Sequence, residues 1–363
     1  AAGTRMEVAP GEERVATGAK SRNTVTMPVK KRRTAPVKAV NPVPRKMNPS
    51  VRLVIGDGSE KAARDLLLAP AGEPGKQCHM RTLLTIAIAC LTVSLTAPAA
   101  PKPDIRNPDE VVVYRRTKEA ELKLEIFRPR DWKADDQRPA IVFFFGGGWT
   151  GGTTAQFHPQ ASRLAALGMV ACCADYRVRS RHRTSPFEAV ADAKAALRWI
   201  WRNAGGQGID PDRIVSAGGS AGGHLAACSG LVAGHDERKE GEPVFIPAAM
   251  VLFNPVIDTS PKGYGHDKLK ARYREISPVE HVHDKAVPTL ILVGSEDTTT
   301  PVTGHKLFAR RMKEKQRSCE LVIWDGQKHG FFNARGNNEN YWETLGSMEK
   351  FLGALNFLPR PGR

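Results

Sequence analysis

Three polar side chains of the sequence have the types and the order that acyl transfer to a serine requires. Ser220 is the centre of a Gly-Gly-Ser-Ala-Gly pentapeptide, Asp297 follows Gly-Ser-Glu, and His329 is followed by a glycine. A serine hydroxyl is a weak nucleophile, so it needs a base within hydrogen-bonding reach and an acid that orients the base. We therefore expect Ser220 to be a nucleophile, His329 its general base and Asp297 the acid.

Other interpretations of these positions exist. Glu296 is the competing acid, and we prefer Asp297 because an acid after Gly-x-x usually occupies such a turn. His224 is close to Ser220 in the sequence, but it lies one helical turn beyond the serine and is expected to point away. Ser220 could instead be a helix N-cap after a glycine turn, and His329 a loop histidine with no chemical role.

A glycine-rich loop supplies the fourth part of the expected chemistry. The apolar run that ends at Phe145 is followed by three glycines and Trp149. Backbone without side chains can turn its N–H groups toward a substrate oxygen. We expect the N–H groups of Gly147, Gly148 and Ala221 to form an oxyanion hole, against the alternative of a merely flexible loop. Trp149 and Phe331 are expected to line the substrate pocket or to belong to the core.

These residues must be held by a rigid scaffold, and the sequence indicates one. Short apolar runs predict eight strands, at 111–114, 122–127, 140–145, 169–174, 213–217, 248–253, 289–293 and 320–324. Most of the runs are apolar on both faces, which is typical of parallel strands covered by helices. Apolar residues at helical spacing predict helices between them, at 188–201, 221–232, 305–312 and 341–355.

The alternation of these runs predicts one α/β domain over 100–363, with a mostly parallel, doubly wound sheet of about eight strands flanked by helices. Ser220, Asp297 and His329 each follow a strand, so they should meet at the edge of the sheet where the carboxyl ends of the strands lie. The polar segment 257–287 is longer than an ordinary loop, and we interpret it as a small lid or loop insertion.

The glycine loop, the serine turn and the His-Gly loop, in this order over 104–358, resemble the esterase and lipase branch of the α/β-hydrolases. The chain is similar in particular to the acetyl-esterase and hormone-sensitive-lipase-like members, whose loop reads His-Gly-Gly-Gly-Trp. Here Phe145 replaces that histidine, so the loop lacks the polar side chain that those members have at this position. Further matching residues are Asp175, Tyr176, Arg177, Pro186, Asp192 and Trp199.

The resemblance implies an α/β-hydrolase fold and the hydrolysis of carboxylic esters, short-chain or acetyl and including those of carbohydrates, through an acyl-enzyme without a cofactor or metal. Two other classes remain open. A peptidase of the prolyl-oligopeptidase kind shares the order of the three residues but usually carries a large additional domain. A hydrolase fold reused only for binding would not need every catalytic position to be filled.

The charge of the chain is concentrated near its start. About half of the net charge of +16 lies before residue 80, in a segment rich in Pro, Lys and Arg. Too few apolar residues are present there to offset the entropy of ordering, so we predict that 1–79 is disordered. The basic run 30–33 is a solvated charge run or a nucleic-acid or targeting patch. No nucleic acid is expected to bind the folded domain.

A signal peptide is predicted at 80–99. Met80 and Arg81 precede an apolar run over 83–95, which is followed by Ala-Pro-Ala. These are the parts of a secretory leader, so we expect translation to begin at Met80 and the protein to be exported. The run is too short for a confident membrane span, and its alternative is a buried helix. Lipidation at Cys90 is disfavoured because alanine stands where a large aliphatic residue is preferred.

The cysteines after the expected leader leave their state open. Cys172, Cys173, Cys228 and Cys319 lie in apolar segments. They fit buried thiols as well as disulfides of an exported domain. The sequence has no Cys-x-x-Cys pair and no Cys/His spacing typical of a metal site.

Overall fold

The computed structural model describes residues 102–238, 240–335 and 339–358. The predicted basic extension at 1–79, the predicted signal peptide at 80–99 and Cys90 lie outside the described residues. Among the helices that are described, none combines the length and the apolar character needed to cross a membrane.

Within the described residues, eight strands form one sheet in the order β1-β2-β4-β3-β5-β6-β7-β8. Strand β2 is antiparallel to both neighbours, and every pair from β4 to β8 is parallel. The strands are β1 (Glu110–Arg116), β2 (Glu121–Phe127), β3 (Arg138–Phe144), β4 (Val170–Ala174), β5 (Ile209–Gly219), β6 (Ala249–Phe253), β7 (Thr289–Gly294) and β8 (Cys319–Trp324). The predicted α/β sheet is therefore confirmed.

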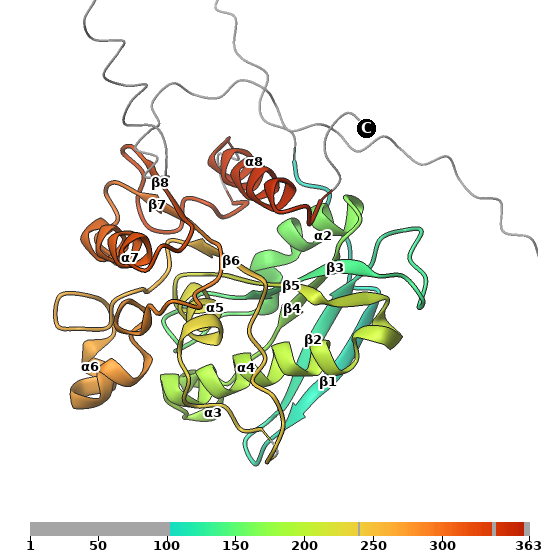
Figure 1. Cartoon of the computed structure of the whole chain (residues 1–363), viewed down its shortest axis with the longest axis horizontal. Helices are drawn as coiled ribbons and strands as arrows, with labels where there is room; N and C mark the ends of the chain where they lie inside the picture. The colour runs from blue at the N-terminus through green and yellow to red at the C-terminus, as the bar shows by residue number, and fades with distance from the viewer. Residues whose placement is uncertain (1–101, 239, 336–338, 359–363) are drawn as a thin grey trace, which may run out of the picture. The chain divides into compact units, whose positions relative to one another are not determined.

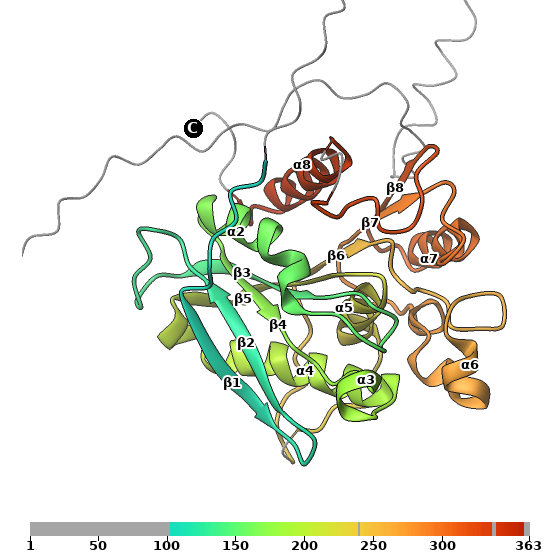
Figure 2. The ribbon, with the colours of Figure 1, turned by 180° about the vertical axis from the view of Figure 1, so that it is seen from behind.

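Helices cover both faces of the sheet. The core on one face contains residues of α4, α5 and α7, and the core on the other contains residues of α2 and α8. Figures 1 and 2 show α2 and α8 above the central strands β3 and β5, and α4 below them. The helices are α2 (His158–Ala166), α3 (Arg179–His182), α4 (Pro186–Arg202), α5 (Ala221–Leu231), α6 (His266–Leu269), α7 (Val302–Glu314) and α8 (Glu339–Ala354).

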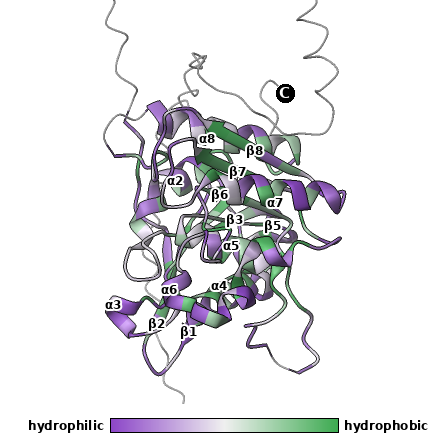
Figure 3. Ribbon diagram, turned by 90° about the vertical axis from the view of Figure 1, so that its left-hand side faces the viewer, coloured by the Kyte–Doolittle hydropathy of each residue, from purple (hydrophilic) through white to green (hydrophobic). Residues whose placement is uncertain are grey.

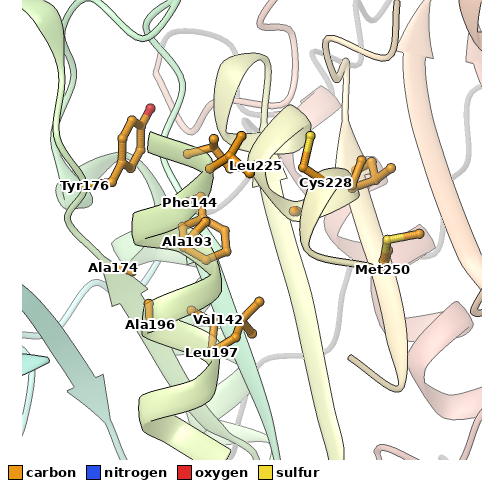
Figure 4. Close-up of a cluster of buried hydrophobic side chains, with 14 of the residues drawn as sticks. Val142, Phe144, Ala174, Tyr176, Ala193, Ala196, Leu197, Leu225, Cys228 and Met250 are labelled. Atoms are coloured by element: carbon orange, nitrogen blue, oxygen red, sulfur yellow. The ribbon is translucent and has the colours of Figure 1, made fainter. Parts of the chain in front are cut away.

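The strands owe their central position to their composition. Every residue of β4, β6 and β7 is buried, and Figure 3 shows apolar strands in the middle with polar helix surfaces outside. Residues of β3, β4, α4 and α5 interlock in one of the two cores, as Figure 4 shows. Helix α4 is capped by Ser185, which directly precedes it and forms a reciprocal capping box with Glu188.

The bounds of several elements differ from the prediction and the short α3 was not predicted, but the largest differences concern α2 and β5. Helix α2 was not predicted, and its buried residues include polar Gln160 and Ser162. Strand β5 begins at Ile209, four residues before the predicted run, because polar residues and a proline interrupt its apolar pattern. The described cysteines Cys172, Cys173, Cys228 and Cys319 are free thiols.

The segment 257–287 contains α6 and the short 3-10 helices η3 (Lys270–Ile276) and η4 (Pro278–His281). Its η4 packs against α5 and α7. Tyr264, just before α6, lies beside the glycine loop, with its ring centroid 5.8 Å from that of Trp149. The segment thus contacts the part of the chain that was expected to hold the substrate oxygen.

Candidate active site

Ser220 occupies a sharp turn between a strand and a helix. Strand β5 ends at Gly219 and α5 begins at Ala221, and Ser220 between them has φ 55° and ψ −119°. Residues other than glycine adopt such angles only where the surroundings enforce them. Here the Ser220 N–H donates to the carbonyl oxygen of Phe253 at 2.9 Å, which ties the turn to the neighbouring strand β6.

The glycines on either side of Ser220 allow the turn to pack closely. A Cβ atom on Gly218 would lie 2.5 Å from the backbone of Gly222, and one on Gly222 would lie 2.0 Å from the carbonyl oxygen of Phe144. Real Cβ atoms essentially never approach so closely. The two glycines therefore let α5, β5 and the end of β3 meet, which brings Ser220 beside the glycine loop.

His329 lies between Ser220 and Asp297. The loop after β7 carries Asp297 and the loop after β8 carries His329. His329 Nε2 is 2.9 Å from Ser220 Oγ, and His329 Nδ1 is 2.7 Å from Asp297 Oδ2. An ionised carboxylate can only accept, so Nδ1 carries the proton and Nε2 accepts from the serine hydroxyl. The three side chains thus form a continuous hydrogen-bonded line.

Asp297 is held as an anion by several donors. Its side chain is fully buried, and its carboxylate accepts from the backbone N–H groups of Thr299 and Thr300 and from the Thr300 hydroxyl, in addition to His329. Burial alone would raise the pKa of Asp297, but the hydrogen bonds from His329 and Thr300 outweigh it and lower the pKa below its ordinary value. The carboxylate therefore stays charged beside the imidazole at neutral pH.

The glycine loop has a backbone that few sequences can adopt. Gly147, Gly148 and Trp149 have φ of 124°, 62° and 59°. The N–H groups of Gly147, Gly148 and Ala221 have no hydrogen-bond partner among the residues that the structure describes. Gly146 is so close to Ser220 that a Cβ on the glycine would lie 3.2 Å from the serine Cβ. Three free N–H groups therefore lie on the segments that flank the serine.

Phe145 anchors this loop through its ring. It is buried and stacks on Tyr176, with ring centroids 4.1 Å apart and planes 17° apart. The Tyr176 hydroxyl donates to the Phe145 carbonyl at 2.7 Å. Aromatic stacking and a backbone hydrogen bond thus hold the loop at the position where the resembled enzymes have a histidine.

Comparisons with known proteins show the family of the chain. The family model described as BD-FAE matches residues 124–312, which is more than half of the chain. The chain belongs to the BD-FAE family. It is 31% identical to esterase LipC of Mycobacterium tuberculosis over 57% of the chain and 56% of LipC. With esterase LipQ of the same organism it shares 27% identity over 69% of the chain and 61% of LipQ. The BD-FAE protein thus spans a little over half the length of these curated relatives.

The chain also matches a solved structure over nearly the whole length of that structure. An esterase from Thermogutta terrifontis, bound to propionate, is 44% identical, with a TM-score of 0.65 over 70% of this chain and 96% of that chain. Other structures of the Thermogutta enzyme contain butyrate or are phosphorylated by paraoxon. The BD-FAE protein therefore has the α/β-hydrolase fold that the resemblance implied, and it is similar to esterases.

The competing residues of this BD-FAE protein lie elsewhere. Glu296 is exposed, while the buried Asp297 contacts His329. His224 is fully buried and its Nε2 donates to the carbonyl oxygen of Ile276 at 2.6 Å, away from the serine. Desolvation by burial lowers the pKa of His224 to about 4, so this imidazole is neutral.

The two residues expected at the substrate pocket are differently exposed. Trp149 is only 2% exposed and packs edge-on against His224 with centroids 4.9 Å apart. Phe331 is half-buried and lies against Trp324. Trp149 therefore supports the glycine loop from inside, and a role of either residue in substrate binding stays a prediction.

Four polar residues at the site were not predicted. Thr300 contacts the Asp297 carboxylate, and the Nδ2 of Asn254 is 3.5 Å from His329 Nε2. The amide of Gln156 accepts from the N–H of Gly146 at 2.6 Å, and Asn333 contacts Gln156. Only Asn254 and Thr300 had a signal, since both follow a predicted strand. Within the described residues, no cluster of His, Cys, Asp or Glu could hold a metal ion.

Proposed function

We propose that the protein is a serine carboxylesterase that cleaves short-chain esters through an acyl-enzyme on Ser220. One observation carries the proposal. The His329 imidazole lies between Ser220 Oγ at 2.9 Å and Asp297 Oδ2 at 2.7 Å, which is the arrangement that activates a serine hydroxyl. Membership of the BD-FAE family and the likeness to named esterases support the choice of esters as substrates.

In the proposed reaction, Ser220 Oγ attacks the ester carbonyl carbon while His329 Nε2 takes the hydroxyl proton. The carbonyl oxygen becomes negative and accepts hydrogen bonds from the N–H groups of Gly147, Gly148 and Ala221. Loss of one such donor typically raises a barrier by about 3 kcal/mol. The Asp297 carboxylate stabilises the imidazolium, because its lowered pKa keeps it charged.

Collapse of this intermediate breaks the bond to the alcohol. His329 gives its proton to the departing oxygen, and the acyl group stays on Ser220. Water then loses a proton to His329 and attacks the acyl carbon, which releases the acid and restores the serine.

Short acyl groups fit both the relatives and the crowding around the loop. The Thermogutta esterase binds propionate and butyrate. In the present chain, the Tyr264 hydroxyl is so close to Gly148 that a Cβ there would lie 2.5 Å from the hydroxyl oxygen. We infer that the insertion limits the space beside the proposed oxyanion hole. Acetyl groups on carbohydrates belong to the same size class.

Hydrolysis of p-nitrophenyl esters from acetate to dodecanoate, with acetylated xylan as a further substrate, tests the proposal. We expect the highest kcat/KM for acetate to butyrate. Ser220→Ala should abolish turnover, whereas Ser347→Ala, which removes a hydroxyl whose hydrogen bond among the described residues lies within α8, should not. Full turnover by Ser220→Ala would refute the mechanism. Preference for an aminoacyl-proline amide over every ester would favour a peptidase instead.

A further inference from the structure

Two amide side chains connect the glycine loop to the loop that carries His329. The Gly146 N–H donates to Gln156 Oε1 at 2.6 Å, and Gln156 Nε2 donates to Asn333 Oδ1 at 2.9 Å. Asn333 Nδ2 then donates to the carbonyl oxygen of Gly330 at 2.7 Å. Gly146 directly precedes the proposed oxyanion donors and Gly330 directly follows His329. This series of hydrogen bonds therefore connects the oxyanion loop with His329, and both must act on the same ester carbonyl.

The direction of this chain is determined by the backbone at its ends. A backbone N–H can only donate, so Gln156 must turn its oxygen toward Gly146 and its NH₂ group toward Asn333. A backbone carbonyl can only accept, so Asn333 must turn its NH₂ group toward Gly330 and its oxygen toward Gln156. Both requirements are met by one orientation of each amide, and neither side chain can rotate without breaking two hydrogen bonds.

Stacked aromatic rings hold the two amides at this separation. Phe157 directly follows Gln156, and Phe332 directly precedes Asn333. The two rings are nearly fully buried and stack with centroids 5.6 Å apart and planes 16° apart. Both also contact Phe253 at the end of β6. The hydrophobic core thus holds the backbone of both amide-bearing segments independently of the hydrogen bond between their side chains.

A third amide extends the connection to the imidazole. Asn254 is fully buried and has a φ of 33°, a conformation that residues other than glycine rarely adopt. The Gly330 N–H donates to Asn254 Oδ1 at 3.0 Å. This bond turns the Asn254 NH₂ group toward His329, whose Nε2 is 3.5 Å away. The backbone N–H and carbonyl of Gly330 are therefore both held by side-chain amides.

We propose that Gln156, Asn333 and Asn254 are positioning residues that form an amide relay, which keeps His329 and the oxyanion loop at a fixed separation across Ser220. The inference rests on the proposed function and adds residues to its machinery. Attack on the carbonyl requires proton transfer to His329 and stabilisation of the oxyanion in one event. An error of about 1 Å between such groups lowers a rate on the order of a hundredfold. The relay prevents this error because each loop is anchored to the other as well as to its own strand.

A double-mutant cycle tests the relay. Gln156→Met keeps the length of the side chain without its hydrogen bonds, and Asn333→Ala removes the second amide. The concentration of active enzyme is first measured with paraoxon, which releases one p-nitrophenol for each serine that it phosphorylates. The hydrolysis rate of each variant is then divided by this concentration of competent serines. We expect each single variant to lower kcat for p-nitrophenyl acetate by about ten- to a hundredfold with little change in KM. The double variant should be no slower than the slower single variant, because either change breaks the same connection.

Gln160→Met is the matched control. It removes the same amide from α2, where Gln160 is buried and has no hydrogen-bond partner among the described residues. Its kcat should equal that of the wild type. A purely structural role for Gln156 and Asn333 predicts fewer competent serines with unchanged kcat for each, and that result would overturn the relay, as would losses that multiply in the double variant.

The two proposals fail in different ways. If the wild type does not hydrolyse the ester, or if Ser220→Ala hydrolyses it as fast as the wild type, the proposed function is wrong. If the wild type depends on Ser220 but the Gln156 and Asn333 variants keep its kcat, only the relay is wrong.

Discussion

Substitution of Gly222 by alanine tests the close packing of the serine turn. A Cβ atom at this position would lie 2.0 Å from the carbonyl oxygen of Phe144 and 2.4 Å from that of Phe145. Ordinary contact begins at 3.4 Å, so α5 and the end of β3 would have to separate by about 1.4 Å, which is 3.4 minus 2.0. Both obstructing atoms belong to the backbone, and neither can rotate away.

This separation would move Ser220 away from the glycine loop, because Ser220 precedes α5 and Phe145 leads into Gly146. A displacement of about 1 Å lowers a rate on the order of a hundredfold, so we expect Gly222→Ala to reduce kcat for p-nitrophenyl acetate by about that factor or more. Overpacking should also lower the free energy of unfolding by about 1 to 3 kcal/mol. Steady-state kinetics and urea titration measure the two effects.

Gly230→Ala on the same helix is the control. Its Cβ would lie 2.7 Å from the sulfur of Met250, and a methionine side chain can adopt another rotamer. Alanine also favours the helix by about 1 kcal/mol relative to glycine. We expect kcat close to that of the wild type. A Gly222→Ala enzyme with undiminished kcat would show that our account of the turn is wrong.

Four further predictions concern the acid, the buried histidine, the glycine loop and the start of the chain. Asp297→Asn should lower kcat by about four orders of magnitude, because an amide no longer holds the correct tautomer of His329; full activity would reassign the acid to Glu296. The pKa of His224 is about 4 in the folded protein and about 6.5 when unfolded, so the unfolded chain takes up the proton first as the pH falls. Stability should therefore decrease by about 3 kcal/mol between pH 6.5 and pH 4 through this residue, and urea titrations of His224→Gln should lack that part of the decrease. Phe145→Ala should lower the free energy of unfolding by about 3 to 5 kcal/mol, because it removes a buried ring and leaves a cavity beside Tyr176, as measured by urea titration; a loss below 1 kcal/mol would contradict the anchoring role of the ring. N-terminal sequencing of the natural protein should find a chain that begins after Ala99, and residues from before Met80 would exclude the predicted start.

The sequence predicts the sheet well because its strands are buried on both faces. Strand β6 contains no polar residue, and the polar residue of β7, Thr289, is its first. Each apolar run therefore identifies its strand directly. The same reasoning fails for α2, where Gln160 and Ser162 are buried among small residues. Polarity and burial do not coincide there, so the apolar residues alone do not mark its buried face.

The site divides in the same way. Ser220, Asp297 and His329 each follow a strand at the same edge of the sheet. Their positions could be predicted because each depends on the apolar run just before it in the sequence. Gln156 and Asn333 are 177 positions apart, and an amide pair at such a separation has no pattern of spacing or charge. Their contact depends on how Phe157 and Phe332 stack, which is a property of the folded core. The anchoring of Phe145 by Tyr176 was hidden for the same reason.

The order of the strands gives the parts of the site unequal local stability. Ser220 follows β5, which has a paired strand on each side, whereas His329 follows β8, which within the described part of the chain pairs with β7 alone, at the edge of the sheet. Edge strands open at lower free energy than central ones, and such opening does not require the whole domain to unfold. On warming, β8 should fray first and withdraw the imidazole while the serine turn stays intact. Catalysis should therefore stop below the melting temperature and return on cooling, and amide hydrogen exchange should be faster in β8 than in β5.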